Sequence, residues 1–232
     1  MSHVFTPPAL VTLPVAGNLG ETFPVHRIYC VGRNYVEHAI EMGFTGREPP
    51  FFFMKPADSV IAVAECETGN MPYPSLTKNL HHEVELVVAI GTGGKNIAAA
   101  DAMKHVWGYA IGLDMTRRDL QGEAKKLGRP WDIGKSFDLS APIGPIKAAA
   151  DCRIDASTPI TLEVNGKMRQ TSTIGKLIWN IAEIIEHLSA AWELQPGDLI
   201  FTGTPEGVAA VVAGDVLTGE VPGVGRLQVQ IV

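Results

Sequence analysis

The chain has 232 residues, of which 46% are hydrophobic and 19% charged, so it can bury a substantial core as one domain. Its formal net charge of −6 argues against nucleic acid or an anionic membrane surface as the main partner. No apolar stretch reaches membrane-spanning length and the N-terminal residues lack a signal-peptide pattern, so we expect a cytoplasmic protein. Three widely spaced cysteines indicate reduced thiols rather than a disulfide framework: Cys30, Cys66 and Cys152.

The first half of the chain alternates turn-rich stretches with short apolar runs. Residues 1–24 are rich in proline and predict an arm laid on the body or on a partner subunit, ahead of one domain over residues 25–232. We expect strands over 25–31, 51–54, 83–90 and 109–113, and helices over 35–42 and 98–106.

The second half contains the clearest local signals. Asn165-Gly166 between two apolar runs predicts a hairpin with a type I′ turn over 161–171. Apolar residues at helical spacing predict a helix over 174–188, capped by Thr171, Ser172 or Thr173. Strands over 199–202 and 227–231 follow, and this order of strands with few helices favours an α+β fold with a large mixed sheet.

Two glutamates one residue apart interrupt the apolar run over 83–90. Side chains at i and i+2 of a strand point to one face, so Glu83 and Glu85 should converge while Val84 and Leu86 pack on the other side. Two like charges so close favour a hard divalent cation such as Mg²⁺, Mn²⁺ or Ca²⁺. The simpler alternative is an edge strand with two solvated glutamates.

Asp114 ends the buried run over 109–113 and is therefore expected at the mouth of the core. It could cap the next helix through backbone amides. Alternatively, with Glu83 and Glu85 it makes a set of three carboxylates that leaves coordination positions for substrate and water, as a catalytic Mg²⁺ requires.

His38 and Glu41 are spaced so that both lie on one face of the expected helix. The glutamate could then orient the imidazole as a general base, as in hydrolytic sites. A histidine and a glutamate on a solvated helix face explain the same spacing.

Several other polar residues have both a structural and a functional interpretation. Lys135 and Lys55 are either partly buried partners of a carboxylate or surface charges. Thr204 lies in a turn after a strand, where a hydroxyl and backbone amides could bind an oxyanion. His81 or His82 could support the neighbouring glutamates through hydrogen bonds.

These segments together resemble the fumarylacetoacetate hydrolase family from about Ile28 to the C-terminus. The resemblance rests on six motifs in order: Val31-Gly-Arg-Asn-Tyr35 with His38 and Glu41, Phe53-Met-Lys-Pro56, His82-Glu-Val-Glu-Leu86, Gly112-Leu-Asp114 with Arg118, Asp119 and Gln121, Lys135-Ser-Phe137, and Thr202-Gly-Thr-Pro-Glu-Gly207. The arm and the run Pro49-Pro-Phe-Phe-Phe-Met-Lys-Pro56 are similar to those of short bacterial members of the family that act on fumarylpyruvate.

The resemblance implies a large mixed sheet rolled into a barrel-like core with a few flanking helices, usually in a homodimer. By position, it implies Mg²⁺ or Mn²⁺ on Glu83, Glu85 and Asp114, and a water-activating dyad of His38 and Glu41. It places Lys135 beside the metal. It assigns substrate contacts to four further residues: Arg118, Gln121, Lys55 and Thr204.

The implied activity is hydrolysis of a C–C bond in a 1,3-dicarbonyl (acylpyruvate) acid. The expected substrate is fumarylpyruvate, cleaved to fumarate and pyruvate in gentisate catabolism. Oxaloacetate decarboxylation, acylpyruvate cleavage of another substrate, and isomerisation or decarboxylation of a hydroxymuconate-type acid are alternatives on the same metal site. A metal-stabilised binding protein without activity is an alternative of another class.

Overall fold

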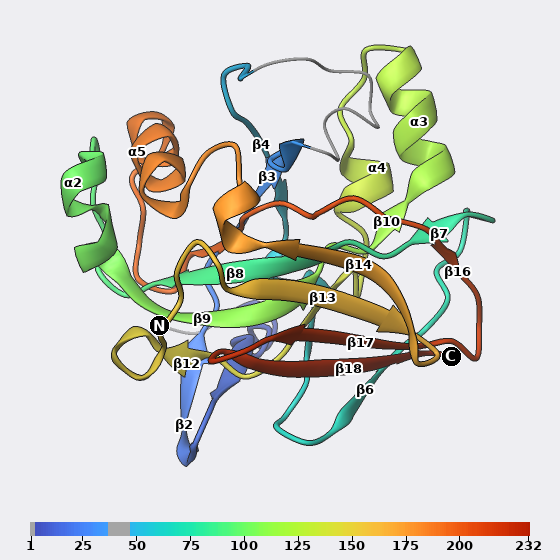
Figure 1. The fold of residues 1–232 in the computed structure, drawn as a ribbon. Coiled ribbons are helices and arrows are strands. Elements are labelled where there is room, and N and C mark those ends of the chain that lie inside the picture. Colours follow the sequence, from blue (N-terminus) through green and yellow to red (C-terminus); the bar gives the residue numbers. More distant parts are fainter. Residues whose placement is uncertain (1–2, 37–46) are drawn as a thin grey trace.

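The structure, a computed structural model, describes residues 3–36 and 47–232. Strands dominate it, and the helices are few and short (Figure 1). Within these ranges the helices are α2 (Ala99–Ala102), α3 (Arg118–Lys126), α4 (Asp132–Lys135) and α5 (Ile181–Ala191), with 3-10 turns at Ala57–Ser59, Met103–His105, Ala149–Asp151 and Ile174–Lys176. None of the helices in these described residues is long and apolar enough to cross a membrane.

A large mixed sheet forms the centre of the molecule. Its strand order is β4 (Phe51–Lys55), β3 (Ile28–Gly32), β15 (Leu199–Phe201), β8 (Val84–Ile90), β9 (Val106–Leu113), β11 (Ala141–Ile143) and β5 (Val60–Ala62), with β12 (Lys147–Ala148) beside β9. The pairs β3–β15 and β5–β11 are parallel and the other pairs are antiparallel.

Three smaller sheets complete the fold. The order in the second sheet is β14 (Lys167–Thr173), β13 (Pro159–Val164), β17 (Val216–Val221), β18 (Gly225–Ile231) and β6 (Thr68–Met71). The third pairs β10 (Thr116–Arg117), β7 (Leu80–His81) and β16 (Ala210–Val211), and the last is the hairpin β1 (Thr12–Val15) and β2 (Asn18–Pro24).

Strand β8 separates two hydrophobic clusters. Val84, Leu86 and Val88 belong to the larger cluster, which also contains side chains of the second sheet and of α5. Val87 and Ala89 belong to the smaller cluster, which contains Leu13 and Phe23 of the N-terminal hairpin. Alternate side chains of β8 therefore face different cores, as the period of two requires. The predicted α+β class with a large mixed, curled sheet is confirmed (Figure 1).

The hairpin at Asn165-Gly166 is confirmed, since both residues have positive φ, 52° and 71°, and Val164 pairs with Lys167. The predicted start of the following helix is wrong. Residues 171–173 belong to β14, and α5 begins only at Ile181, where Asn180 and Glu183 form a capping box.

The helix predicted over 98–106 is also too long, because β9 already begins at Val106. The segment predicted as an arm contains the hairpin of β1 and β2, which was not predicted, and β5, β6 and β17 were missed as well. Most of the helix predicted over 35–42 lies outside the described residues. Tyr35, which is described, forms an isolated bridge with Leu177.

Candidate metal centre

Strand pairing brings the three predicted carboxylates together. Glu85 lies in β8, Glu83 directly precedes that strand, and Asp114 directly follows β9. The antiparallel register pairs Val84 with Leu113, and the backbone amide of Asp114 donates to the carbonyl of Glu83 at 2.9 Å. The two acids at the strand ends are thus neighbours although 31 positions apart in sequence.

The three carboxylates form a buried group that fits a divalent cation. Glu83, Glu85 and Asp114 are 5%, 2% and 1% exposed, and one oxygen from each lies within 4.8 Å of the others. Burial raises the pKa of Glu85 well above its usual range, and the charges of Asp114 and Glu83 raise it further. An all-oxygen set of this kind suits Mg²⁺ or Mn²⁺, and a bound dication would offset the repulsion.

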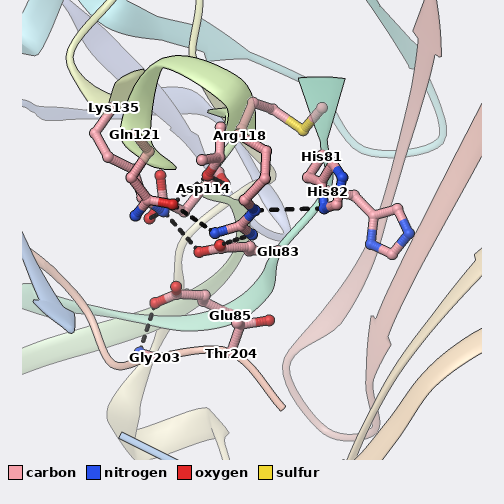
Figure 2. Close-up of polar contacts among 12 residues, drawn as sticks. His81, His82, Glu83, Glu85, Asp114, Arg118, Gln121, Lys135, Gly203 and Thr204 are labelled. Carbon is pink, nitrogen blue, oxygen red and sulfur yellow. Dashed lines mark hydrogen bonds and ion pairs between the residues drawn. The ribbon is translucent and has the colours of Figure 1, made fainter. Parts of the chain in front are cut away.

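Lys135 is the main counter-charge of the group (Figure 2). Its ammonium, at the end of α4, lies 2.7 Å from Glu83 Oε2, 2.6 Å from Asp114 Oδ2 and 2.7 Å from the Thr116 hydroxyl. Burial lowers the pKa of Lys135, but the charges of Asp114 and Glu83 outweigh that effect and raise it overall. The side chain therefore stays cationic and acts through its charge.

Two more cations contact the same carboxylates. The Arg118 guanidinium donates from Nη2 to Glu83 Oε1 and from Nη1 to Gln121 Oε1, the latter at 2.6 Å (Figure 2). Lys55, 1% exposed, has its Nζ 2.9 Å from Asp114 Oδ1 and also donates to the Ser140 hydroxyl at 2.9 Å. Glu83 and Asp114 thus each have a cationic partner, as the burial of a charge requires.

The loop after β15 holds the third acid. The backbone amide of Gly203 donates to Glu85 Oε2 at 2.5 Å, and Thr204 follows it (Figure 2). The Gln170 amide nitrogen donates to the Thr204 hydroxyl at 2.8 Å and to the Pro205 carbonyl at 2.8 Å. This loop is therefore fixed to the second sheet at Gln170 and to the site at Glu85.

A pocket opens beside the carboxylates. Its polar lining is contributed by Arg33, Glu83, Glu85, Asp114, Arg118, Gln121, Lys135 and Thr204, and the rest by Val31, Gly32, Phe53 and Trp131. Seven of the ten predicted site residues therefore line this one pocket, which makes a small polar ligand its natural occupant.

One predicted site residue within the described part of the chain lies outside this pocket. Lys55 is not in the pocket lining; it packs behind Asp114 and binds the carbonyls of Met115 and Lys135. His38 and Glu41 lie outside the described residues, so the dyad stays a prediction. The individual ligand and substrate roles of the other residues likewise stay predictions.

The two histidines beside Glu83 have structural partners. His82, fully buried, donates from Nδ1 to Gln170 Oε1 at 2.9 Å, and burial lowers its pKa. Arg118 Nε lies 3.4 Å from His81 Nδ1, and burial together with the charge of Arg118 lowers the pKa of His81 to about 4. Both imidazoles are therefore neutral near pH 7.

Sequence inspection missed three residues that shape the site. Gln170 links β8, β14 and the loop after β15, because its Oε1 also accepts from the amide of Val84 at 3.1 Å. Asn34 donates to the carbonyls of Trp179 and Thr202 at 2.9 and 2.8 Å. Arg33 lines the pocket itself. Gln170 lies between Arg169 and Thr171 in a largely polar strand, so no sequence pattern marked its burial, and Asn34 and Arg33 looked like ordinary turn residues.

Comparison with known proteins defines the class. The family model for the fumarylacetoacetate (FAA) hydrolase C-terminal region matches residues 27–232. The chain therefore belongs to the fumarylacetoacetate hydrolase family, and the predictions of that family and of an enzyme within it are confirmed.

Individual members of the family that are similar to this chain include fumarylpyruvate hydrolases and an oxaloacetate tautomerase. The crystal structure of fumarylpyruvate hydrolase from Pseudomonas aeruginosa in complex with Mn²⁺ and pyruvate is 55% identical, covers 100% of this chain and 99% of that chain, and superposes with a TM-score of 0.97. A fumarylpyruvate hydrolase of Ralstonia is 45% identical over 79% of this chain and 93% of its own length. An oxaloacetate tautomerase of Escherichia coli is 38% identical over 84% of this chain and 88% of its own.

Proposed function

We propose that the chain is a Mg²⁺- or Mn²⁺-dependent hydrolase that cleaves fumarylpyruvate to fumarate and pyruvate. The observation that carries the proposal is the buried group of Glu83, Glu85 and Asp114 at the base of a pocket. The 55% identical relative with Mn²⁺ and pyruvate bound supports both the metal and the substrate class.

The three carboxylates would hold the metal, and the neighbouring cations would hold the substrate. A bound dication supplies Lewis-acid polarisation of the 2-keto oxygen and charge neutralisation. Arg118, Gln121 and Thr204 line the pocket beside the carboxylates and can bind the carboxylate and keto oxygens of the pyruvyl end. Arg118 can do so because it keeps donor hydrogens beyond those given to Glu83 and Gln121.

Hydrolysis then needs an activated water and a stabilised enolate. His38, oriented by Glu41, would take a proton from water as the oxygen adds to the 4-keto carbon. The bond between C3 and C4 breaks, its electron pair passes to C3 and the 2-keto group as pyruvate enolate, and C4 leaves as the new carboxyl group of fumarate. The cationic Lys135 stabilises the enolate charge, which a proton at C3 then quenches.

Oxaloacetate tautomerisation is a second candidate, favoured by the 38% identical relative that carries out this reaction. Tautomerisation passes through an enolate but does not consume water. The two candidates therefore differ in whether they need a water activated by His38 and Glu41.

The test compares substrates and one variant. Purified metal-loaded protein is given fumarylpyruvate, acetylpyruvate and oxaloacetate, and products are measured by chromatography. We expect fumarate and pyruvate in equal amounts from fumarylpyruvate, and we expect His38→Ala to lose this activity while still binding Mn²⁺. Turnover of oxaloacetate alone, unaffected by His38→Ala, would instead establish the second candidate.

The proposal also places the protein in the cytoplasm, as a homodimer acting in gentisate breakdown. The N-terminal segment supports an association between copies because Val4, Phe5 and Leu10 are exposed, at 101%, 75% and 68%. Light scattering of the purified protein measures the assembly, and a monomer at micromolar concentration would contradict it.

A further inference from the structure

Arg33 occupies an unusual position at the edge of the pocket. It follows β3 directly, lines the pocket, and has a φ of 54°, in the left-handed region that residues other than glycine seldom adopt. Strained backbone of this kind is maintained where the surrounding structure holds it, and it concentrates at functional sites.

Two aromatic rings support the Arg33 guanidinium. Its central carbon lies 5.1 Å from the centre of the Phe51 ring and 6.0 Å from that of Trp131, and the two rings meet edge to face at 5.3 Å. A Cβ on the preceding Gly32 would lie only 2.0 Å from the Phe51 ring. Glycine at that position therefore allows the ring to lie under the guanidinium.

The turn that carries Arg33 is fixed to the loop after β15. The Asn34 side chain donates to the Thr202 carbonyl at 2.8 Å and accepts from the Trp179 amide at 2.8 Å. A Cβ on Gly203 would lie 2.7 Å from Asn34 Cβ, so the two backbones are in close contact. Because Gly203 binds Glu85, the position of Arg33 is set relative to the carboxylates.

The pocket thus has two guanidinium groups with different surroundings. Arg118 contacts Glu83 and lies among the carboxylates, where the pyruvyl end would bind. Arg33 directly follows β3 and lies over aromatic rings. Val31, Phe53 and Trp131 supply apolar lining suited to a carbon chain. A ligand with an acid group at each end of an apolar chain matches this arrangement.

We propose that Arg33 binds the distal carboxylate of the substrate, and so makes the site selective for acylpyruvates that are dicarboxylic acids. The inference rests on the proposed function and deepens it, because it assigns a residue to the fumaryl end. Acetylpyruvate, which has no distal carboxylate, would gain nothing from Arg33.

The test measures kcat and KM for fumarylpyruvate and acetylpyruvate in four proteins: wild type, Arg33→Gln, Arg33→Lys and Arg129→Gln. Arg129 is exposed in the loop after α3, outside the pocket lining, so its variant removes the same charge and controls for the effect of net charge on substrate binding. For Arg33→Gln we expect kcat/KM on fumarylpyruvate to fall about 10- to 100-fold, mostly through KM, because a charged hydrogen bond is lost. Acetylpyruvate turnover should be unchanged, and Arg33→Lys should recover part of the loss.

An equal loss on both substrates in Arg33→Gln, or no loss on either, would overturn the assignment. If the wild type cleaves neither substrate, the proposed hydrolysis is wrong. The role of Arg33 is then tested by ligand binding alone. Mn²⁺-loaded protein is then titrated with 2-oxoheptanedioate and 2-oxoheptanoate, which have the same chain length and differ in the distal carboxylate. Tighter binding of the diacid by about tenfold, lost in Arg33→Gln, supports the assignment, and equal affinities contradict it.

Discussion

Lys135 is the residue on which the metal-free site depends most. Its buried ammonium lies within 2.7 Å of both Glu83 and Asp114, so its removal leaves these acids without their main counter-charge. We expect Lys135→Met to lower the free energy of unfolding of the metal-free protein by about 3 kcal/mol in urea titrations. Saturating Mn²⁺ should reduce this deficit because a dication replaces the lost charge.

Lys104→Met is the matched control for this substitution. Lys104 also has its Nζ 2.6 Å from an acid, Asp101, but both side chains are exposed. Solvent screens such a pair, so the variant should match the wild type. Equal unfolding midpoints for Lys135→Met and the wild type would contradict the role of Lys135.

The three cysteines should differ in reactivity. Burial raises the pKa of Cys30 well above its usual range, and nearby Asp114 raises it further. A raised pKa keeps the thiol protonated and unreactive at pH 8. Cys66 is exposed, and Cys152 is intermediate with its pKa raised by burial. We expect iodoacetamide to label Cys66 first, Cys152 more slowly and Cys30 only in urea, as read by peptide mass spectrometry.

At the scale of single residues, the sequence was sufficient to predict the positions of side chains that follow from strand periodicity. Glu83 and Glu85 were predicted to share one side of a strand, and they do lie together with Asp114. It was not sufficient to predict the burial of Lys55 behind Asp114. That burial depends on contacts with Ser140 and Met115, which are 85 and 60 positions away in the sequence. Such contacts arise from tertiary packing, which no local pattern encodes.

Among the elements, the loop after β15 has the most direct effect on the carboxylates. Gly203 has a φ of 106° and donates its amide to Glu85, and an added Cβ would lie 2.7 Å from Asn34 Cβ. We expect Gly203→Ala to destabilise the protein and to weaken Mn²⁺ binding. Urea unfolding and titration of the Mn²⁺ electron paramagnetic resonance signal measure the two effects.

Gly214→Ala separates backbone strain from steric contact. Gly214 has a similar φ of 96°, but an added Cβ meets nothing within 4 Å. The free energy of unfolding of Gly214→Ala should fall only by the cost of a left-handed alanine, about 1–2 kcal/mol, and its Mn²⁺ affinity should be unchanged. If both variants behave alike, the contact between Gly203 and Asn34 is unimportant for the site.

The elements also show where periodicity misleads. The apolar spacing over 174–188 is helical, yet Ile178 and Trp179 lie in a bend, where their backbone amides donate to the Asn34 backbone carbonyl and side chain, at 2.8 Å in both cases. Tertiary hydrogen bonds thus override the local preference until Asn180 caps α5. The hairpin at Asn165-Gly166 was predictable because its turn is encoded by two adjacent residues.

At the scale of the whole molecule, the site lies where a central strand meets two cores. β8 is buried on both sides, by the larger cluster through Leu86 and by the smaller one through Val87. Glu85 lies in the same strand, next to Leu86, and is therefore buried by the same packing. The fold accepts an acid there because Gly203 and a cation can satisfy it, which ties metal binding to folding.

Metal dependence of turnover tests this account most directly. The protein is stripped with a chelator, and fumarylpyruvate cleavage is followed while Mn²⁺ is added back to the wild type and to Glu85→Gln. We predict no activity in the stripped protein, full recovery near one equivalent of Mn²⁺ in the wild type, and a loss of about 100-fold or more in Glu85→Gln. Full activity after exhaustive chelation, or recovery of Glu85→Gln to the wild-type rate, would contradict the account.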